Sequence, residues 1–199
     1  MIKNKPHSSK AIFLIGFMAS GKSTIGKHLA GLLEANFIDL DQWIETKTGS
    51  SISDIFQEKG ADYFRKLEQK ALRTIIKKVG KGEEQQPKKI PKKWLIATGG
   101  GTPCFFDNLK LMKECGQVFY LKATEEVIFN RLKKKQLAIS QRPLLKKANN
   151  AEALRFFIQQ KLAERKDIYE QADAVIVVEE EQPVRLICEQ IQAYLRVSA

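Results

Sequence analysis

Cysteine is scarce in this sequence, and its arrangement excludes most of its usual structural roles. Cys104, Cys115 and Cys188 are an odd number at scattered spacings, with no C-x-x-C pair and no histidine near them to complete a metal site. Small secreted proteins normally carry an even set of cysteines that forms a disulfide framework. We therefore expect a reduced, cytoplasmic location.

Long apolar runs are also missing. No segment approaches the roughly 18 uncharged apolar residues of a membrane span, so we expect a soluble protein without a membrane partner. Lysines before the apolar residues 11–19 could suggest a signal peptide. However, the apolar run continues directly into a phosphate-binding pattern that cleavage would destroy. We expect residues 1–10 to be a loose tail.

Acidic residues are outnumbered, with 23 Asp and Glu against 34 Lys and Arg, which gives a net charge of +11. A polyanion such as nucleic acid could bind such a surface. Much of the excess lies in residues 77–93, which hold seven lysines, two glutamates, two glycines, two prolines and no aromatic ring for base stacking. We interpret this stretch as a solvated loop, over about 80–93, and expect no nucleic-acid partner. Polyphosphate and carboxylate ligands suit a basic surface equally well.

Short apolar runs alternate with helical patterns along the chain. Residues 11–15 form an apolar run that stops at Gly16, as in a parallel strand buried on both faces. Similar runs predict further strands, and apolar residues at helical spacing predict a helix from Lys22 and others between and after the strands. The strands are expected at 11–15, 37–38, 94–97, 118–121 and 174–178, and the later helices within 44–76 and over 125–135, 151–171 and 184–195. This order predicts an α/β fold with a five-stranded parallel sheet, in one domain over 11–199, with ligands beyond the carboxyl ends of the strands.

The first predicted strand leads into a phosphate-binding pattern. Residues 16–23, Gly-Phe-Met-Ala-Ser-Gly-Lys-Ser, fit G-x-x-x-x-G-K-[ST]. Glycines let backbone amides approach the β- and γ-phosphates, Lys22 brings a positive charge to the phosphate oxygens, and Ser23 offers its hydroxyl to Mg²⁺. A glycine-rich turn could match by chance, but the strand before it and the helix after it are independent requirements that the sequence also meets. We therefore predict a nucleotide site.

Two carboxylates follow the second predicted strand. Asp39 and Asp41 are two residues apart and would point to the same face of an extended strand. Beside a phosphate site, one could hold Mg²⁺ while the other accepts the proton of an attacking hydroxyl. They could instead cap the next helix, because aspartate is a favoured N-cap residue. We favour the catalytic interpretation, although the spacing does not assign the two roles.

Three arginines stand out from the lysine-rich background: Arg65 in D-Y-F-R, Arg142 in Q-R-P-L-L and Arg165 in A-E-R-K-D-I-Y. A guanidinium can bind a carboxylate through two parallel hydrogen bonds, or neutralise a phosphoryl group during transfer. Taken singly, each arginine would more often belong to a surface ion pair. Their sequence surroundings favour a functional interpretation.

Together these segments resemble the shikimate kinase family, whose members phosphorylate the 3-hydroxyl of shikimate on the route to chorismate and the aromatic amino acids. The resemblance runs in order from Gly16 to Asp173 and includes G-x-x-x-x-G-K-S-T-I-G, D-x-D, D-I-F followed by F-R-x-x-E, G-G-G, R-P-L-L and R-x-x-x-Y-x-x-A-D. It implies a three-layer α/β/α P-loop kinase, similar to the nucleoside monophosphate kinases. The family further implies ATP and shikimate as substrates, Mg²⁺ as cofactor and a monomer.

The resemblance also implies roles for the acidic and arginine residues. Asp41 matches the residue beside the reacting hydroxyl, as its base or orienting group, whereas Ser23 and Asp39 match the Mg²⁺ side. Arg65 and Arg165 match the pair that holds the shikimate carboxylate.

The remaining implied contacts surround the two substrates. Residues 99–101 would approach shikimate with their backbone, and Phe56 and Phe64 would wall its ring. Arg142 would reach over the phosphates from a mobile lid at about 133–150, and Arg131 would lie against adenine. The implied substrate glycines are Gly99, Gly100 and Gly101, and the implied ATP contacts are Gly16, Ala19, Ser20, Gly21, Lys22, Ser23, Thr24, Arg131 and Arg142. The implied catalytic residues are Asp41, Lys22 and Arg142.

Two features depart from the family pattern. Ala19 stands in the phosphate loop where many relatives have glycine, which requires a backbone conformation that alanine accepts, and we expect little effect. The lysine-rich loop is longer than the family resemblance implies. This length leaves open whether the loop binds an extra partner, but it does not affect the expected activity.

Two other function classes fit part of the pattern. A gluconate kinase or a nucleoside monophosphate kinase shares the architecture, but a nucleotide acceptor would need more basic charge than Arg65 and Arg165 supply. A nucleotide-dependent binding protein without catalysis would have no use for Asp41 as a base or Arg142 as a lid residue.

Overall fold

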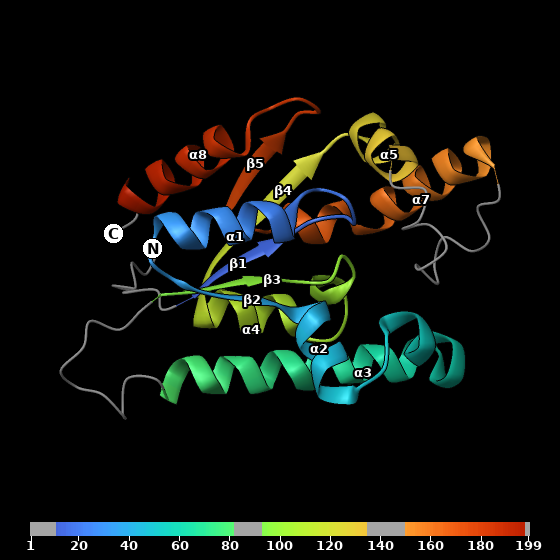
Figure 1. The fold of residues 1–199 in the computed structure, drawn as a ribbon, viewed down its shortest axis with the longest axis horizontal. Coiled ribbons are helices and arrows are strands. Elements are labelled where there is room, and N and C mark those ends of the chain that lie inside the picture. Colours follow the sequence, from blue (N-terminus) through green and yellow to red (C-terminus); the bar gives the residue numbers. More distant parts are fainter. Residues whose placement is uncertain (1–10, 82–92, 135–149, 198–199) are drawn as a thin grey trace.

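Residues 11–81, 93–134 and 150–197 are described by the structure, a computed structural model of the chain. Within these residues, five parallel strands form a sheet in the order β2-β3-β1-β4-β5, as Figure 1 shows. The strands are β1 (Ala11–Ile15), β2 (Asn36–Asp39), β3 (Trp94–Ala97), β4 (Gly116–Ala123) and β5 (Ala174–Val178). The predicted α/β fold with a five-stranded parallel sheet is confirmed.

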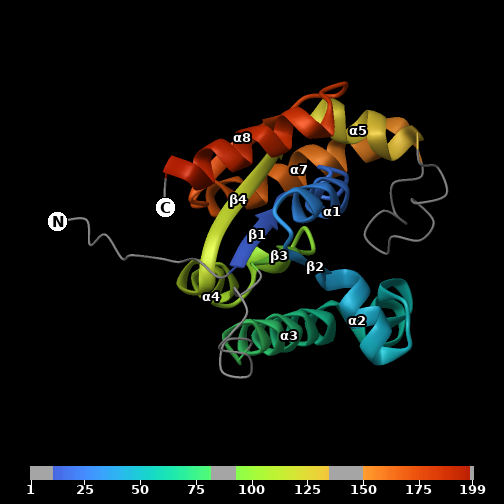
Figure 2. The same cartoon turned by 60° about the vertical axis from the view of Figure 1, so that its left-hand side comes forward.

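Helices lie on both sides of this sheet. In Figures 1 and 2, α1 and α8 pack together on one side, and α3 and α4 pack together on the other. The helices are α1 (Lys22–Leu32), α2 (Leu40–Thr48), α3 (Ile52–Lys81), the 3₁₀ helix η1 (Thr102–Cys104), α4 (Asn108–Cys115), α5 (Glu125–Lys134), α7 (Ala151–Tyr169) and α8 (Val184–Val197). The sequence did not predict η1 and α4, because such short segments show too few apolar repeats.

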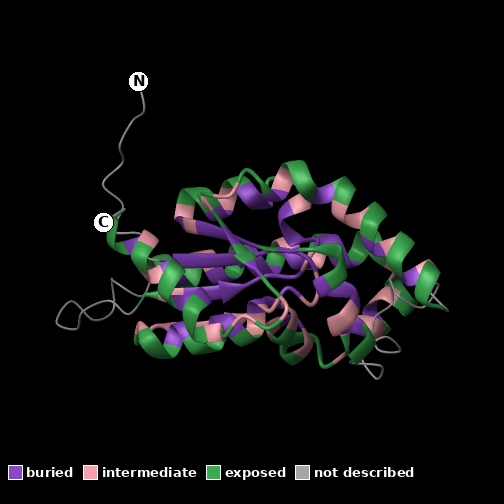
Figure 3. Ribbon diagram, turned by 90° about the horizontal axis from the view of Figure 1, so that it is seen from above, coloured by how far each residue is buried: buried purple, intermediate pink, exposed green. Residues whose placement is uncertain are grey.

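The core is centred on β1, whose five residues are all buried, and Figure 3 shows the buried residues concentrated in the sheet. Helix α1 lies close to the sheet at Gly26, where a Cβ would come within 2.6 Å of the Phe37 ring. Strand β5, which we expected to be buried, has Val175 and Val177 exposed by 42% and 54%. That expectation was wrong because β5 is an edge strand, where the helical layers no longer cover both faces.

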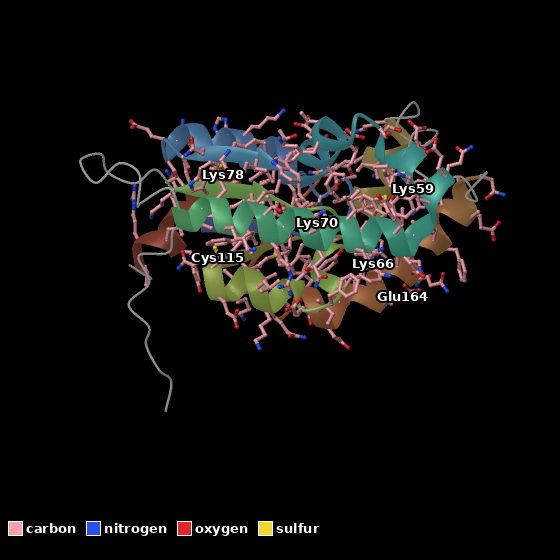
Figure 4. The ribbon with its side chains drawn as sticks, turned by 90° about the horizontal axis from the view of Figure 1, so that it is seen from below. Lys59, Lys66, Lys70, Lys78, Cys115 and Glu164 are labelled. Carbon is pink, nitrogen blue, oxygen red and sulfur yellow. The ribbon has the colours of Figure 1, made fainter. Side chains whose placement is uncertain are left out.

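Helix α3 carries part of the positive charge. Its helical path is broken at Gly60, which has φ 79° and ψ 174°. Lys59, Lys66, Lys70 and Lys78 lie exposed along its outer side, as Figure 4 shows. The lysine-rich stretch therefore begins within a helix rather than a loop, and α3 continues to Lys81. The rest of the predicted loop, residues 82–92, lies outside the described residues, as does most of the predicted lid, 135–149. Among the described helices, none is long and apolar enough to cross a membrane.

Candidate active site

The carboxyl ends of β1, β2 and β3 meet at one edge of the sheet, because β1 and β2 both pair with β3 in parallel. A cavity of about 620 Å³ opens there. The predicted site residues that line it are Ala19, Gly21, Lys22, Ser23, Thr24, Asp39, Asp41, Phe56, Phe64, Arg65, Gly99, Gly100, Gly101, Arg131 and Arg165. Gly16 and Ser20 are buried and are not part of its lining. Arg142 lies outside the described residues.

The phosphate loop, residues 16–23, joins β1 to α1 through conformations that glycine favours. Gly16 has φ 139°, and a Cβ there would lie 2.7 Å from the carbonyl oxygen of Leu121. Gly21 has φ 100° and is the N-cap of α1, so it has no side chain that could accept a hydrogen bond from the first amides of the helix. These amides and the positive end of the helix dipole can therefore receive an anion.

Ala19 adopts a backbone conformation that we did not expect. Its φ is 61°, in the left-handed region, so the expectation that alanine sits in a compatible conformation was wrong. Contact between Cβ and the following carbonyl makes this region cost about 1–2 kcal/mol for alanine. The Arg131 Nη1 atom donates to the Ala19 carbonyl oxygen at 3.2 Å and helps to hold the loop in this shape.

Lys22 is buried within the loop. Its Nζ donates to the carbonyl oxygens of Gly16 and Phe17 at 2.9 and 2.7 Å. The ammonium group also borders the cavity. A positive charge therefore lies inside the ring of backbone that the loop forms, where a polyphosphate would bind.

Asp39 and Ser23 are in direct contact. The Ser23 hydroxyl donates to Asp39 Oδ2, while Asp39 Oδ1 accepts from the amides of Asp41 and Gln42 at 3.1 and 3.3 Å. Asp39 therefore also caps α2, as the alternative interpretation proposed. The prediction that Asp39 and Asp41 share a strand was wrong: Asp39 ends β2, and Asp41 lies in the first turn of α2 because the helix begins at Leu40.

The Ser23–Asp39 pair fits a magnesium ion. Mg²⁺ takes oxygen ligands and usually combines one or two protein oxygens with water and phosphate oxygens. In the part of the chain that the structure describes, no cluster of three His, Cys, Asp or Glu side chains could hold an ion without such help. An ion at this pair would therefore depend on a bound nucleotide.

Residues 99–101 form a glycine turn after β3. At each of these glycines, an atom of another segment comes close to the position that a Cβ would occupy. A Cβ on Gly99 would lie 2.9 Å from Asp41 Oδ1, and one on Gly101 would lie 2.7 Å from both terminal nitrogens of Arg65. A Cβ on Gly100 would lie 3.2 Å from the amide nitrogen of Met18 in the phosphate loop. The glycine turn therefore brings Asp41, the phosphate loop and Arg65 within contact of three consecutive residues.

Arg65 is held by a carboxylate and by aromatic rings. It is 8% exposed, and its Nη1 donates to Glu68 Oε2 at 2.5 Å. Its guanidinium carbon lies 5.7 and 5.3 Å from the ring centroids of Phe56 and Phe64, which pack together at 4.5 Å. The guanidinium is thus fixed in orientation, because its ion pair with Glu68 is buried away from competing water.

Arg165 reaches the glycine turn from α7. It is buried, and its guanidinium carbon lies 5.5 Å from the ring centroid of Phe17. Its Nη1 would lie 3.6 Å from a Cβ on Gly100. Two guanidinium groups from different helices therefore border the same turn, an arrangement that suits one bound carboxylate.

Arg131 connects the phosphate loop to the segment after β5. Its Nη2 donates to the Glu179 carbonyl oxygen at 3.0 Å, in addition to the contact with Ala19. Burial lowers the pKa of this guanidinium, and the charge of Glu180 opposes the change. The predicted contact of Arg131 with adenine stays a prediction.

Three further residues of the site had no role in the sequence analysis. Thr102 Oγ1 donates to Glu68 Oε1 at 2.5 Å, and the Tyr169 hydroxyl donates to the Gly100 carbonyl oxygen. Glu68 and Tyr169 were letters of the F-R-x-x-E and R-x-x-x-Y motifs. Their positions three and four residues after a predicted arginine place them on the same helical face, which is a signal that could have identified them. Thr102 had no such signal.

Comparison with known proteins extends over nearly the whole chain. The model of the shikimate kinase family matches residues 18–196. A shikimate kinase of Azobacteroides pseudotrichonymphae is 41% identical over 172 residues, which cover 85% of this chain and 90% of that protein. The crystal structure of shikimate kinase from Bacteroides thetaiotaomicron is 31% identical, with a TM-score of 0.77 over 94% of this chain and 98% of that one. Shikimate kinase from Acinetobacter baumannii, in complex with shikimate, is 29% identical, with a TM-score of 0.78 over 96% of this chain and 94% of that one.

Proposed function

This chain belongs to the shikimate kinase family, and from that premise we propose how its own residues transfer the γ-phosphate of ATP to the 3-hydroxyl of shikimate. The activity makes it a phosphotransferase of aromatic amino acid biosynthesis. The observation that carries the assignment of residues is the glycine turn, because Asp41, the phosphate loop and Arg65 all contact it.

The ATP phosphates bind in the phosphate loop. The amides at the start of α1 and the Lys22 ammonium face the β- and γ-phosphates, and Thr24 and Arg131 border the same cavity. Ser23 and Asp39 would hold Mg²⁺, which when bound neutralises charge on the phosphate oxygens. Arg142 would reach this nucleotide from the predicted lid.

Shikimate binds on the other side of the glycine turn. Arg65 and Arg165 hold its carboxylate, since both guanidinium groups are buried beside the turn and can each donate two hydrogen bonds. Phe56 and Phe64 pack against the ring. With the carboxylate fixed, only one hydroxyl can face the phosphate loop.

The chemical step needs a group that accepts or orients the proton of the attacking 3-hydroxyl. The 3-hydroxyl oxygen forms a bond to the γ-phosphorus while the bond from that phosphorus to the β-γ bridging oxygen breaks, and ADP carries the electron pair away. Asp41 borders the cavity next to Gly99 and accepts or orients the hydroxyl proton. Exclusion of water by a closing lid would suppress ATP hydrolysis.

We also infer that the chain works as one domain over 11–199, because residues from most of that range line one cavity. A monomer, which the family resemblance implies, and a cytoplasmic location, which the odd and scattered cysteines favour, belong to the same proposal. Size-exclusion chromatography with light scattering tests the monomer: a mass near 22.6 kDa is expected.

Coupled ADP release with a set of acceptors tests the proposed function. Turnover is expected with shikimate and Mg²⁺-ATP, and none with gluconate or without an acceptor. Methyl shikimate lacks the carboxylate charge and should bind weakly, whereas 3-deoxyshikimate should bind as a competitive inhibitor without turnover. Equal rates with shikimate and gluconate would contradict the assignment, as would full turnover of the methyl ester.

A further inference from the structure

Tyr169, the last residue of α7, is completely buried although it carries a hydroxyl group. This hydroxyl donates a hydrogen bond to the Gly100 carbonyl oxygen. Arg165, one helical turn earlier, places its charge near the same hydroxyl, and its Nη1 would lie 3.6 Å from a Cβ on Gly100. One buried hydroxyl therefore holds the peptide of the glycine turn against which Arg165 lies.

We propose that Tyr169 is a positioning residue for acceptor binding, because its hydroxyl fixes the Gly100 peptide beside the Arg165 guanidinium. The inference rests on the proposed function, since it concerns the same shikimate pocket. Tyr169 does not border the cavity and takes no direct part in the reaction. It acts through the Gly100 peptide that it holds.

The position of Gly100 explains why this link matters for the acceptor. A Cβ on Gly100 would lie 3.2 Å from the Met18 amide and 3.4 Å from the Gly16 carbonyl oxygen, so the phosphate loop packs directly against it. The Tyr169 hydroxyl contacts the same peptide through its carbonyl oxygen. The turn is therefore held between the nucleotide loop and Tyr169, beside the Arg165 guanidinium.

The hydroxyl is chemically suited to a permanent link. Burial raises the pKa of Tyr169, and the nearby charge of Arg165 opposes this rise only in part. The group thus keeps its proton and can continue to donate to the Gly100 carbonyl oxygen. A neutral, buried tyrosine of this kind fixes geometry and is not a proton carrier.

Packing and positioning can be separated, because the ring and the hydroxyl make different contacts. The Tyr169 ring packs against the Tyr120 ring, with 4.9 Å between the ring centroids, and this contact should stay intact in Tyr169→Phe. Only the hydrogen bond to Gly100 is lost. The phosphate loop keeps its own contacts, such as those of Lys22 with Gly16 and Phe17, so ATP binding should change little.

The test compares Tyr169→Phe with the matched control Tyr120→Phe, which removes a hydroxyl from the neighbouring buried ring. Steady-state kinetics with shikimate and ATP and thermal unfolding are measured for both. In Tyr169→Phe, the KM for shikimate should rise about tenfold, because the Gly100 carbonyl oxygen loses its buried hydrogen-bond donor. The KM for ATP should stay within about twofold of the wild type, and Tyr120→Phe should keep both values.

An unchanged KM for shikimate in Tyr169→Phe, with or without a lower melting temperature, would show a merely structural role and overturn the inference. Equal increases for shikimate and ATP would also overturn it. Wild-type protein without shikimate turnover would instead contradict the proposed function itself. The two failures are therefore distinguishable.

A second variant covers the case in which Tyr169→Phe does not fold. Replacement of Tyr169 by 4-aminophenylalanine keeps an N–H donor for Gly100. The KM for shikimate should then stay within about twofold of the wild type, with the KM for ATP unchanged. A tenfold rise in the KM for shikimate in this variant, with a normal melting temperature, would contradict the role of the hydrogen bond to Gly100.

Discussion

The substitution Arg65→Lys keeps the positive charge of the shikimate pocket but removes its forked geometry. Arg65 is buried, pairs with Glu68 Oε2 at 2.5 Å and lies beside the packed rings of Phe56 and Phe64. A lysine ammonium is a point charge with no planar pair of donors. It can satisfy Glu68, but it cannot at the same time present two parallel N–H groups to a bound carboxylate.

The size of the effect follows from the bonds that are lost. One charge-assisted hydrogen bond contributes about 1.5–3 kcal/mol, and each 1.4 kcal/mol is a factor of ten, so the KM for shikimate should rise roughly 10- to 150-fold. The KM for ATP should change less than about twofold, because Arg65 contacts Gly101 rather than the phosphate loop. Coupled ADP release, with each substrate varied at saturation of the other, measures both.

Arg73→Lys is the matched control on the same helix. The Arg73 Nη2 atom pairs with Asp107 at 2.9 Å, and the two side chains are 50% and 45% exposed. A surface pair of this kind contributes at most about 1 kcal/mol to stability and lies outside the site. Both KM values should therefore be unchanged. A normal KM for shikimate in Arg65→Lys, or an equal rise in Arg73→Lys, would refute the carboxylate assignment.

Other substitutions test Asp41 as the base, the glycine turn and the partly buried Cys104 thiol. Asp41→Asn should lower kcat by roughly 10²–10⁴ with little change in ATP affinity, and normal turnover would remove Asp41 from the mechanism. Gly101→Ala places a methyl group 2.7 Å from the Arg65 guanidinium, so the KM for shikimate should rise about tenfold through overpacking. Gly31→Ala, where a Cβ has no atom within 4 Å, should leave kinetics unchanged and stabilise α1 by about 0.5–1 kcal/mol. Burial raises the pKa of Cys104 from 9.0 to about 11, so its contribution to stability is complete below pH 9 and is lost as the pH rises through about 11. The melting temperature should thus fall more steeply between pH 9 and 11 in the wild type than in Cys104→Ala, and parallel curves would contradict this.

The sequence predicted best where the cause is local. The apolar run 11–15, the glycines of residues 16–23 and the start of the next helix at Lys22 depend on neighbouring residues, and each is found as expected. Backbone detail within these segments was harder. Ala19 has a left-handed conformation, which a contact from the distant Arg131 helps to hold, and Asp41 lies on a helix rather than on a strand.

Contacts between distant segments were largely beyond the sequence. Tyr169 and Gly100 are 69 residues apart, and Thr102 and Glu68 are 34 apart. These pairs meet because α3 and α7 both pack against η1, which follows the glycine turn. The apolar spacing within either helix does not predict this packing. The sequence motifs include Glu68 and Tyr169, but only the packing of the helices shows which residues these two bind by hydrogen bonds. The role of Arg142 stays a prediction.

A crystal structure of the chain with ADP, Mg²⁺ and shikimate tests the central claim most directly, which is that Arg65 and Arg165 anchor the acceptor beside Asp41. The account predicts the shikimate carboxylate between the two guanidinium groups and the 3-hydroxyl about 2.6–3.2 Å from an Asp41 carboxylate oxygen, facing the phosphate loop. A carboxylate bound away from both arginines, or a 3-hydroxyl turned away from Asp41, would contradict it.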